Sequence, residues 1–265
     1  MILPEAVIFD WAGTTVDFGS MAPVAAFRAA FADFGISPTD AEIRAPMGML
    51  KRDHIKAMLK GERIAQEFLA RHGRASTGDD AEAIYSRFEP ALMAGLPSHC
   101  ELKEGLLGAV SLLRSLGIRI GSTTGYTPKM MEVVVEKAAE QGYRPDCVAT
   151  AADAGGHGRP WPYMIFCNME RLGVKRVSSL IKIGDTPSDM QEGRNAGAFT
   201  VGIAEGSSAA GCSAAQWAAL GDADRKAALS KAAAALYGAG ADLVARSLGD
   251  MEEILAAFSS RASAS

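Results

Sequence analysis

The chain has 265 residues, of which 48% are hydrophobic and 22% charged, and its formal net charge is −4. This composition is typical of a folded globular protein with a sizeable core, and the interspersed charges argue against a nucleic-acid-binding surface. Four cysteines without CxxC spacing argue against a zinc site and a disulfide framework. Because no segment resembles a signal peptide or a membrane span, we expect a cytoplasmic protein with reduced cysteines and no membrane partner.

The first predicted strand is the apolar run at residues 7–9, which ends at Asp10. Gly13 and two threonines follow as a turn. Such a run is typical of a buried strand in a parallel sheet, and the carboxyl ends of these strands carry the chemistry of open α/β folds. Asp10 is therefore a candidate metal ligand or nucleophile, beside backbone N–H groups that could face an anion. Taken alone, the stretch also fits a strand that ends in a turn-favouring aspartate.

Residues 19–99 show helical periodicity and no strand pattern. Because the next strand pattern in the sequence begins only after residue 102, this region is predicted to be a helical insertion after the first strand. We expect a core domain of residues 1–18 and 100–265 and a helical cap domain of residues 19–99. Helices are predicted at about residues 21–35, from 38–40, from 50 onward, at 64–72 and at 81–93. The first of these could present its apolar face to the core or to a partner.

Strands and helices alternate in the rest of the chain, which predicts an α/β fold with a Rossmann-like parallel sheet. The expected strands are residues 117–124, 147–150, 178–184 and 199–203, with a possible edge strand at 243–245. The expected helices are residues 105–116, 128–142, 163–171, 190–196, 223–236 and 251–258.

Polar groups follow three of these later strands. Thr124 and Gly125 stand where the second strand runs into a turn, Arg159 lies in a glycine-rich loop after the third, and Asp185 and Asp189 follow the fourth. Together with the carboxylate after the first strand, they offer a hydroxyl, a cation and a pair of acids at one edge of a sheet. This set of groups suits metal-assisted phosphoryl transfer.

The order and content of these motifs resemble the haloacid dehalogenase superfamily. The resemblance implies that Asp10 is the nucleophile and that Thr124, with Gly125, and Arg159 bind the phosphoryl group. It also implies that the insertion is that superfamily's helical cap, which would close over the core at hinges near residues 19–20 and 97–98.

The same resemblance implies a magnesium site. Asp10, the carbonyl of Ala12 and Asp185 would bind the ion, and hard oxygen ligands of this kind suit it. Asp189 would support the site by holding metal-bound waters or the arginine of the third motif.

Ala12 departs from the phosphatase pattern of the superfamily. At this position, two residues after the nucleophile, the phosphatases have a second aspartate that protonates the leaving oxygen. General acid catalysis contributes little when the leaving atom is carbon, so Ala12 fits cleavage of a carbon–phosphorus bond. Ala12 also fits a chain that has lost its activity.

Residues 46–54, together with 10–17 and 121–127, closely resemble the phosphonoacetaldehyde hydrolase family. That family cleaves a carbon–phosphorus bond to give acetaldehyde and phosphate, and it uses a lysine of the cap. Lys51 is the matching residue and would form a protonated imine with the aldehyde, which gives the departing carbon an electron sink.

The resemblance assigns further residues of the insertion and one of the core to the site. His54 would move protons during imine formation, and Met47, Met49 and Tyr126 would line the pocket. Without the resemblance, Lys51 would be taken as a solvated surface lysine, His54 as a partly exposed histidine and the methionines as packing.

Three other functions remain open on the sequence. A phosphomonoesterase or phosphomutase of the same superfamily would need an acid in place of Ala12, and a metal-free dehalogenase would not need Asp185 beside Asp189. A binding module would keep the fold without turnover. For the preferred function the resemblance implies a small phosphonate substrate and a homodimer.

Overall fold

A computed structural model describes residues 2–264 of the chain. Its sheet has six parallel strands in the order β3-β2-β1-β4-β5-β6. The strands are β1 (Ala6–Phe9), β2 (Arg119–Thr123), β3 (Cys147–Ala149), β4 (Leu180–Gly184), β5 (Phe199–Ile203) and β6 (Leu243–Ala245).

The chain order reverses between β1 and β4, which are neighbours in the middle of the sheet. Phe9 pairs with Ile183 on one side and with Ser122 of β2 on the other. The residues that follow these three strands therefore emerge together at one edge. In open parallel sheets this switch point is where ligands bind.

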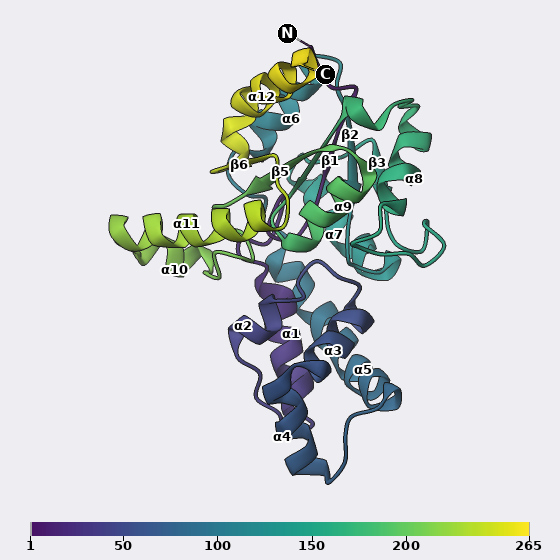
Figure 1. The fold of residues 1–265 in the computed structure, drawn as a ribbon, viewed down its shortest axis with the longest axis vertical. Coiled ribbons are helices and arrows are strands. Elements are labelled where there is room, and N and C mark those ends of the chain that lie inside the picture. The colour runs from purple at the N-terminus through teal and green to yellow at the C-terminus, as the bar shows by residue number, and fades with distance from the viewer. Residues whose placement is uncertain (1, 265) are drawn as a thin grey trace.

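Helices cover both faces of the sheet (Figure 1). On one side lie α6 (Leu106–Ser115), α7 (Pro128–Glu140) and α12 (Met251–Ala264), and on the other lie α8 (Tyr163–Leu172) and α9 (Pro187–Ala196). Alternate residues of β1 serve the two layers, because Val7 and Phe9 join one apolar cluster while Ala6 and Ile8 join the other. Near β5 and β6 lie α10 (Ala214–Ala219) and α11 (Asp222–Gly238).

Five helices between β1 and β2 form the lower end of the molecule in Figure 1. They are α1 (Met21–Ala32), α2 (Asp40–Arg44), α3 (Lys51–Lys60), α4 (Glu62–His72) and α5 (Gly78–Gly95), followed by the short 3-10 turn η1 (Leu96–His99). The apolar face of α1 packs on α5, and Val24, Phe27 and Phe31 are buried there. That face is therefore core, and the expectation that it could meet a partner is not supported.

The two chain crossings between this insertion and the sheet lie side by side, because Val16 and Leu102 form an antiparallel bridge. At the first crossing the carboxylate of Asp17 accepts hydrogen bonds from the N–H groups of Met21 and Ala22, at 2.9 and 3.0 Å. These bonds satisfy free donors at the start of α1 and fix its direction relative to the sheet.

The α/β fold with a Rossmann-like sheet is confirmed, and β5 and β6 lie at the predicted residues. Helix α1 ends at Ala32 rather than near residue 35, where Gly35 takes a left-handed conformation with φ 71°. The short helix α10 was not predicted from its Ala-rich segment. The division into domains of residues 1–18 with 100–265 and of residues 19–99 stays a prediction.

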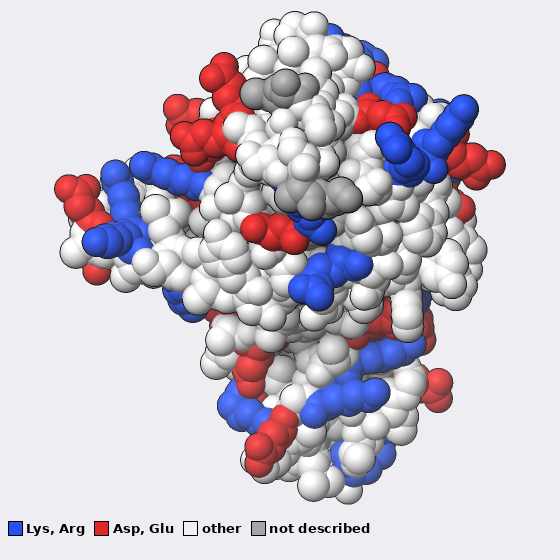
Figure 2. Space-filling model, turned by 45° about the horizontal axis from the view of Figure 1, so that its top comes forward, with Lys and Arg blue, Asp and Glu red and all other residues white. Residues whose placement is uncertain are grey.

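Acidic and basic side chains alternate over the surface that Figure 2 shows, without a broad field of one sign. Within residues 2–264, no helix combines the length and the apolar character that crossing a bilayer requires.

Candidate active site

Asp10 leaves the sheet at the end of β1 and enters a tight turn. Its N–H donates to the carbonyl of Ile183 on β4 at 2.9 Å, and three successive N–H groups of residues 14–16 donate to the carbonyl of Trp11. Gly13 has φ 91°, and a Cβ atom there would lie 2.2 Å from a carboxylate oxygen of Asp185. Glycine thus lets the turn pass beside a second acid.

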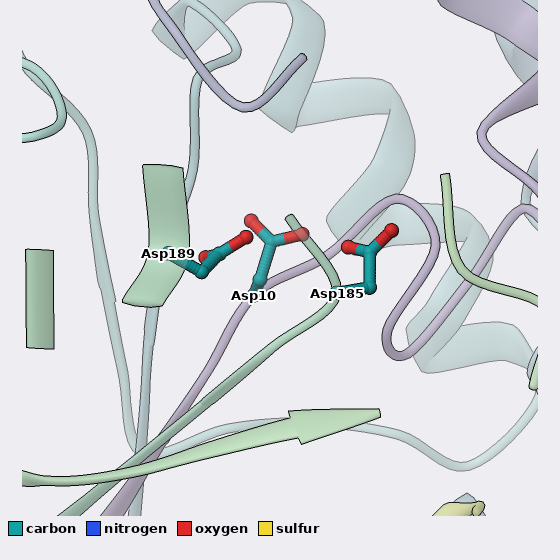
Figure 3. A group of neighbouring side chains, drawn as sticks. All are labelled: Asp10, Asp185 and Asp189. Carbon is teal, nitrogen blue, oxygen red and sulfur yellow. The ribbon is translucent and has the colours of Figure 1, made fainter. Parts of the chain in front are cut away.

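Asp10, Asp185 and Asp189 bring carboxylate oxygens within 4.8 Å of one another. Figure 3 shows Asp10 between the other two. All three side chains are nearly or fully buried. Burial raises the pKa of Asp10, although Arg159 opposes the rise. Three acids so close together in a buried site need cations nearby to remain ionised.

Asp185 is held in a single orientation by the two neighbouring loops. One oxygen accepts a hydrogen bond from the hydroxyl of Thr14 at 3.1 Å, and the other accepts one from the N–H of Ser208 at 2.7 Å. Burial and the charges of Asp10 and Asp189 nevertheless raise its pKa to about 8. The protein's own groups therefore leave this carboxylate short of positive charge.

A divalent cation between Asp10 and Asp185 would supply the missing charge, and the groups present fit such an ion. Both side chains offer hard oxygen ligands, Ala12 lines the same cavity as Asp10, and its carbonyl accepts a hydrogen bond from the Ser20 hydroxyl at 3.1 Å. The donor set therefore suits magnesium, which binds through oxygen and keeps several waters.

Arg159 neutralises the opposite side of the cluster. Its Nη2 lies 2.7 Å from Asp10, its Nη1 lies 3.0 Å from Asp189, and its Nε donates to Glu192 at 2.9 Å. Burial alone would lower the pKa of this guanidinium, but the three acids outweigh it and raise the pKa. Arg159 thus contacts the expected nucleophile directly, and Asp189 contacts Arg159.

Lys182, Glu192 and Thr123 complete the network and were not singled out from the sequence. Lys182 Nζ lies 2.9 Å from Asp189, 3.2 Å from Glu192 and 2.8 Å from the Thr123 hydroxyl. All of these side chains are fully buried. A lysine inside an otherwise apolar parallel strand was the available signal, because such strands are covered on both faces.

A second buried lysine joins the loops that follow β1 and β5. Lys103 Nζ donates to the carbonyl of Gly13 at 2.5 Å and to that of Glu205 at 2.6 Å. Burial lowers its pKa to about 8. No sequence pattern indicated this contact, since Lys103 lies just before α6 in a polar segment.

Lys51 is buried, and only 5% of it is exposed, so the alternative view of a solvated surface lysine is wrong. It is the first residue of α3, and its Nζ lies 5.0 Å from the ring centre of Tyr126 and 5.9 Å from that of Phe27. Burial lowers its pKa to about 8, Asp10 opposes this effect and Arg159 adds to it. The positive end of the helix dipole acts in the same direction as burial.

His54 is also fully buried rather than partly exposed. Its Nε2 lies 2.8 Å from the carbonyl of Ile43 and must donate to it, and its ring lies on that of Phe27 with centres 3.9 Å apart. Burial and the charge of Lys51 hold the pKa of His54 well below its usual value. The neutral ring therefore keeps a lone pair on Nδ1, which has no hydrogen-bond partner among the described residues.

Most of the expected site residues, from both parts of the chain, line one small cavity of about 20 Å³, whereas His54, Asp185 and Asp189 do not. This space suffices for a water molecule or so. Met49 is not among the lining residues, and it lies half-buried with its carbonyl against Gly125. The cavity is lined by Asp10, Ala12, Ser20, Pro23, Met47, Gly48, Lys51, Thr124, Gly125, Tyr126, Arg159 and Thr186.

Thr124 is the expected phosphoryl-binding hydroxyl, and it lies directly after β2. Its Oγ1 accepts a hydrogen bond from the N–H of Tyr126 at 3.1 Å, so the hydroxyl proton is free to point at a ligand. The side chain is 3% exposed, and it faces the cavity together with Gly125.

The family model for haloacid dehalogenase-like hydrolases matches residues 4–197. A phosphonoacetaldehyde hydrolase of Lysinibacillus sphaericus is 46% identical over 227 residues, which are 86% of this chain and 84% of that protein. The crystal structure of a phosphonoacetaldehyde hydrolase-like protein from Oleispira antarctica superposes with a TM-score of 0.94 at 37% identity, and the match covers 98% of this chain and 96% of that one.

A more distant structure has the same fold. The β-phosphoglucomutase of Clostridium difficile gives a TM-score of 0.70 at 15% identity, and the match covers 98% of this chain and all of that one. At this identity the likeness concerns the fold alone.

Magnesium should stabilise the folded chain through Asp185. At a hundredfold excess over its dissociation constant, a ligand of the folded state adds about 2.7 kcal/mol, which corresponds to a rise of about 5–10 °C in Tm. In Asp185→Asn this rise should disappear, while the metal-free variant should unfold no earlier than the metal-free parent because one buried like charge is gone. Differential scanning calorimetry with magnesium and with a chelator measures both. An unchanged magnesium shift in the variant would contradict the metal assignment.

Lys182→Met should destabilise the chain by about 3–5 kcal/mol, because it leaves Asp189 and Glu192 short of one buried cation. Chemical denaturation followed by circular dichroism measures the loss. The exposed Lys175→Met serves as the matched control and should stay within about 0.5 kcal/mol of the parent. Equal stability of the two variants would mean that Lys182 does not balance the cluster.

Proposed function

The chain belongs to the phosphonoacetaldehyde hydrolases of the haloacid dehalogenase-like hydrolase family, and on that premise we propose that it hydrolyses phosphonoacetaldehyde to acetaldehyde and phosphate. One observation carries the proposal. The buried amine of Lys51 shares a cavity with Asp10 and Ala12, so that an amine stands near a nucleophile that lacks the usual second acid. This combination suits a carbon leaving group and not an oxygen leaving group.

Imine formation would begin at Lys51. At pH 7 a pKa of about 8 leaves roughly a tenth of the amine unprotonated, which is enough to attack an aldehyde. Loss of water then gives a protonated imine. His54 is suited to move a proton through the free Nδ1, because its Nε2–H is committed to the carbonyl of Ile43.

Asp10 would then attack phosphorus, and the electron pair of the carbon–phosphorus bond would move into the protonated imine to form an enamine. A proton adds to the enamine carbon, and water releases acetaldehyde from Lys51. A second water releases phosphate from Asp10. The reaction as a whole consumes one water per phosphonoacetaldehyde.

The groups around Asp10 suit the charge that develops on the transferred phosphoryl group. Arg159 holds the carboxylate in place, Thr124 offers a free hydroxyl proton, and the N–H groups of Trp11 and Ala12 remain outside the hydrogen bonds of the turn.

A magnesium ion would be held by Asp10, the carbonyl of Ala12 and Asp185. When bound, it would neutralise phosphonate oxygens and orient them for in-line attack. Asp189 would support the site by fixing Arg159.

Substrate entry would require the helical insertion to lift from the sheet, because a cavity of about 20 Å³ does not admit a phosphonate. We propose that residues 19–99 act as the cap and that the hinges lie near residues 19–20 and 97–98. Gly19 and Ser20 have φ values of 83° and 53°, which marks a local change of chain direction at the first crossing. A homodimer remains a prediction from the family resemblance, and a cytoplasmic location remains a prediction from the sequence.

A magnesium-dependent phosphomonoesterase or phosphomutase is the alternative. The shared fold with β-phosphoglucomutase fits it, but Ala12 offers no acid for an oxygen leaving group. Phosphate release from phosphonoacetaldehyde, compared with release from phosphate monoesters, separates the two functions. Faster turnover of the monoesters would favour the alternative.

The roles of Lys51 and Asp10 predict opposite behaviour of two variants. Lys51→Arg keeps a positive charge but cannot form an imine, so it should lose cleavage by several orders of magnitude and should not be trapped by borohydride with acetaldehyde. Asp10→Asn should release no phosphate and still be trapped at Lys51. Mass spectrometry of the trapped peptide makes the assignment. Normal cleavage by Lys51→Arg, or trapping at another lysine, would remove the imine from the mechanism.

The lowered pKa of Lys51 predicts the pH dependence of imine formation. The fraction of unprotonated amine rises about tenfold per pH unit up to about pH 8 and then levels off. For an ordinary lysine this fraction would continue to rise up to about pH 10. The initial rate of borohydride trapping with acetaldehyde should follow the first profile. A rate that still climbs between pH 9 and pH 10 would mean that Lys51 is not buried in the reacting protein.

A further inference from the structure

The residue before Lys51 meets the sheet domain at a glycine. A Cβ atom built on Gly158 would lie only 2.4 Å from Cγ of Leu50 and 2.9 and 3.0 Å from its two Cδ atoms. Gly158 is buried and has no left-handed φ, so steric clearance is the reason for glycine at this position. Leu50 is half-buried and directly precedes α3.

Two further glycines lie along the same contact between the insertion and the sheet edge. A Cβ on Gly48 would lie 2.4 Å from the Thr186 hydroxyl, and one on Gly125 would lie 2.7 Å from the carbonyl of Met49. Neither glycine is suited to a test by alanine substitution, because Gly48 has φ 89° and Gly125 lines the cavity itself. Gly158 can accept alanine without backbone strain and lies outside the cavity lining.

We propose that Leu50 and Gly158 form a steric seat that sets Lys51 against Asp10 when the insertion closes. Both are positioning residues, and the inference rests on the proposed function of Lys51. The pair can set this distance because each of the two residues is next in the chain to a residue of the site. Leu50 is bonded to Lys51, and Gly158 is bonded to Arg159, which lies 2.7 Å from Asp10. A methyl group on Gly158 would push Lys51 away from Arg159 and Asp10.

Gly158→Ala should therefore hold the insertion partly open. Closing over the extra methyl group would overpack the contact, and such overpacking corresponds to a loss on the order of tenfold to a hundredfold in kcat/KM for phosphonoacetaldehyde. Adding Leu50→Ala removes the atoms that clash. The double variant should recover most of the lost activity, although Leu50→Ala alone should be slightly impaired. If Gly158→Ala simply damaged the fold, a second substitution would not be expected to restore the activity.

Exposure of Lys51 gives a readout that needs no substrate. An N-hydroxysuccinimide ester should label Lys51 about fivefold faster, or more, in Gly158→Ala than in the parent. Lys56 and Lys60, exposed on the same helix, provide the internal reference. The double variant should return Lys51 toward its original protection. Peptide mass spectrometry reports all three lysines in one digest.

Gly108→Ala is the matched control, because this glycine of α6 has open space around a would-be Cβ. It should match the parent in labelling and turnover. The proposal is contradicted if Gly158→Ala behaves like the parent, since the Leu50 side chain would then adjust to the methyl group without moving the insertion. It is also overturned if the double variant is no better than Gly158→Ala, or if neither folds.

The two proposals fail in different ways. If the parent does not cleave phosphonoacetaldehyde, the proposed function fails, and the labelling of Lys51 still decides whether the seat exists. If the parent cleaves it and labelling does not respond to Gly158→Ala, only the seat fails.

Discussion

The balance of buried charge at the carboxyl end of the sheet constrains the rest of the structure. Two cations, Arg159 and Lys182, lie within ion-pair distance of three of the acids, while Asp185 has only hydrogen bonds. Buried ion pairs add little net stability, so their value here is positional. They hold Asp10 in place and oppose the effect of burial on its pKa, and the deficit at Asp185 leaves room for a divalent ion. The four acids are Asp10, Asp185, Asp189 and Glu192.

The same constraint explains why the site is shared between the sheet and the inserted helices. A lysine on an open surface would be protonated at neutral pH, whereas burial between the insertion and the sheet, with a smaller contribution from Arg159, lowers the pKa of Lys51 to about 8. Burial is useful in the proposed reaction only if it is reversible, since the closed cavity holds no more than a water or so. The nucleophile can thus be built permanently into the sheet, whereas the amine must arrive with the insertion.

The fold and most of the cavity residues could be predicted from the sequence, because the carboxyl ends of the strands in a parallel sheet lie at one edge. Sequence reasoning found Asp10, Arg159 and Asp185 through their positions after apolar strands. It missed Lys182 and Glu192, whose partners lie on separate elements, since periodicity does not reveal which charges meet in the core. Met49 was expected in the pocket but turns its backbone to Gly125, because helical spacing does not apply in a loop.

Ala12 and Lys51 are best understood as two consequences of one requirement. An aspartate at position 12 would add another acid beside Asp10, which already lies close to Asp185 with its pKa of about 8, and it would need a further cation. A carbon leaving group makes no use of such an acid, whereas it does need somewhere for the electron pair to go. In the proposed reaction the amine of Lys51 would answer that need as an imine, and as an ammonium group it would add positive charge to the cavity that Asp10 lines. Loss of the acid and gain of the lysine therefore favour one another, electrostatically as well as chemically.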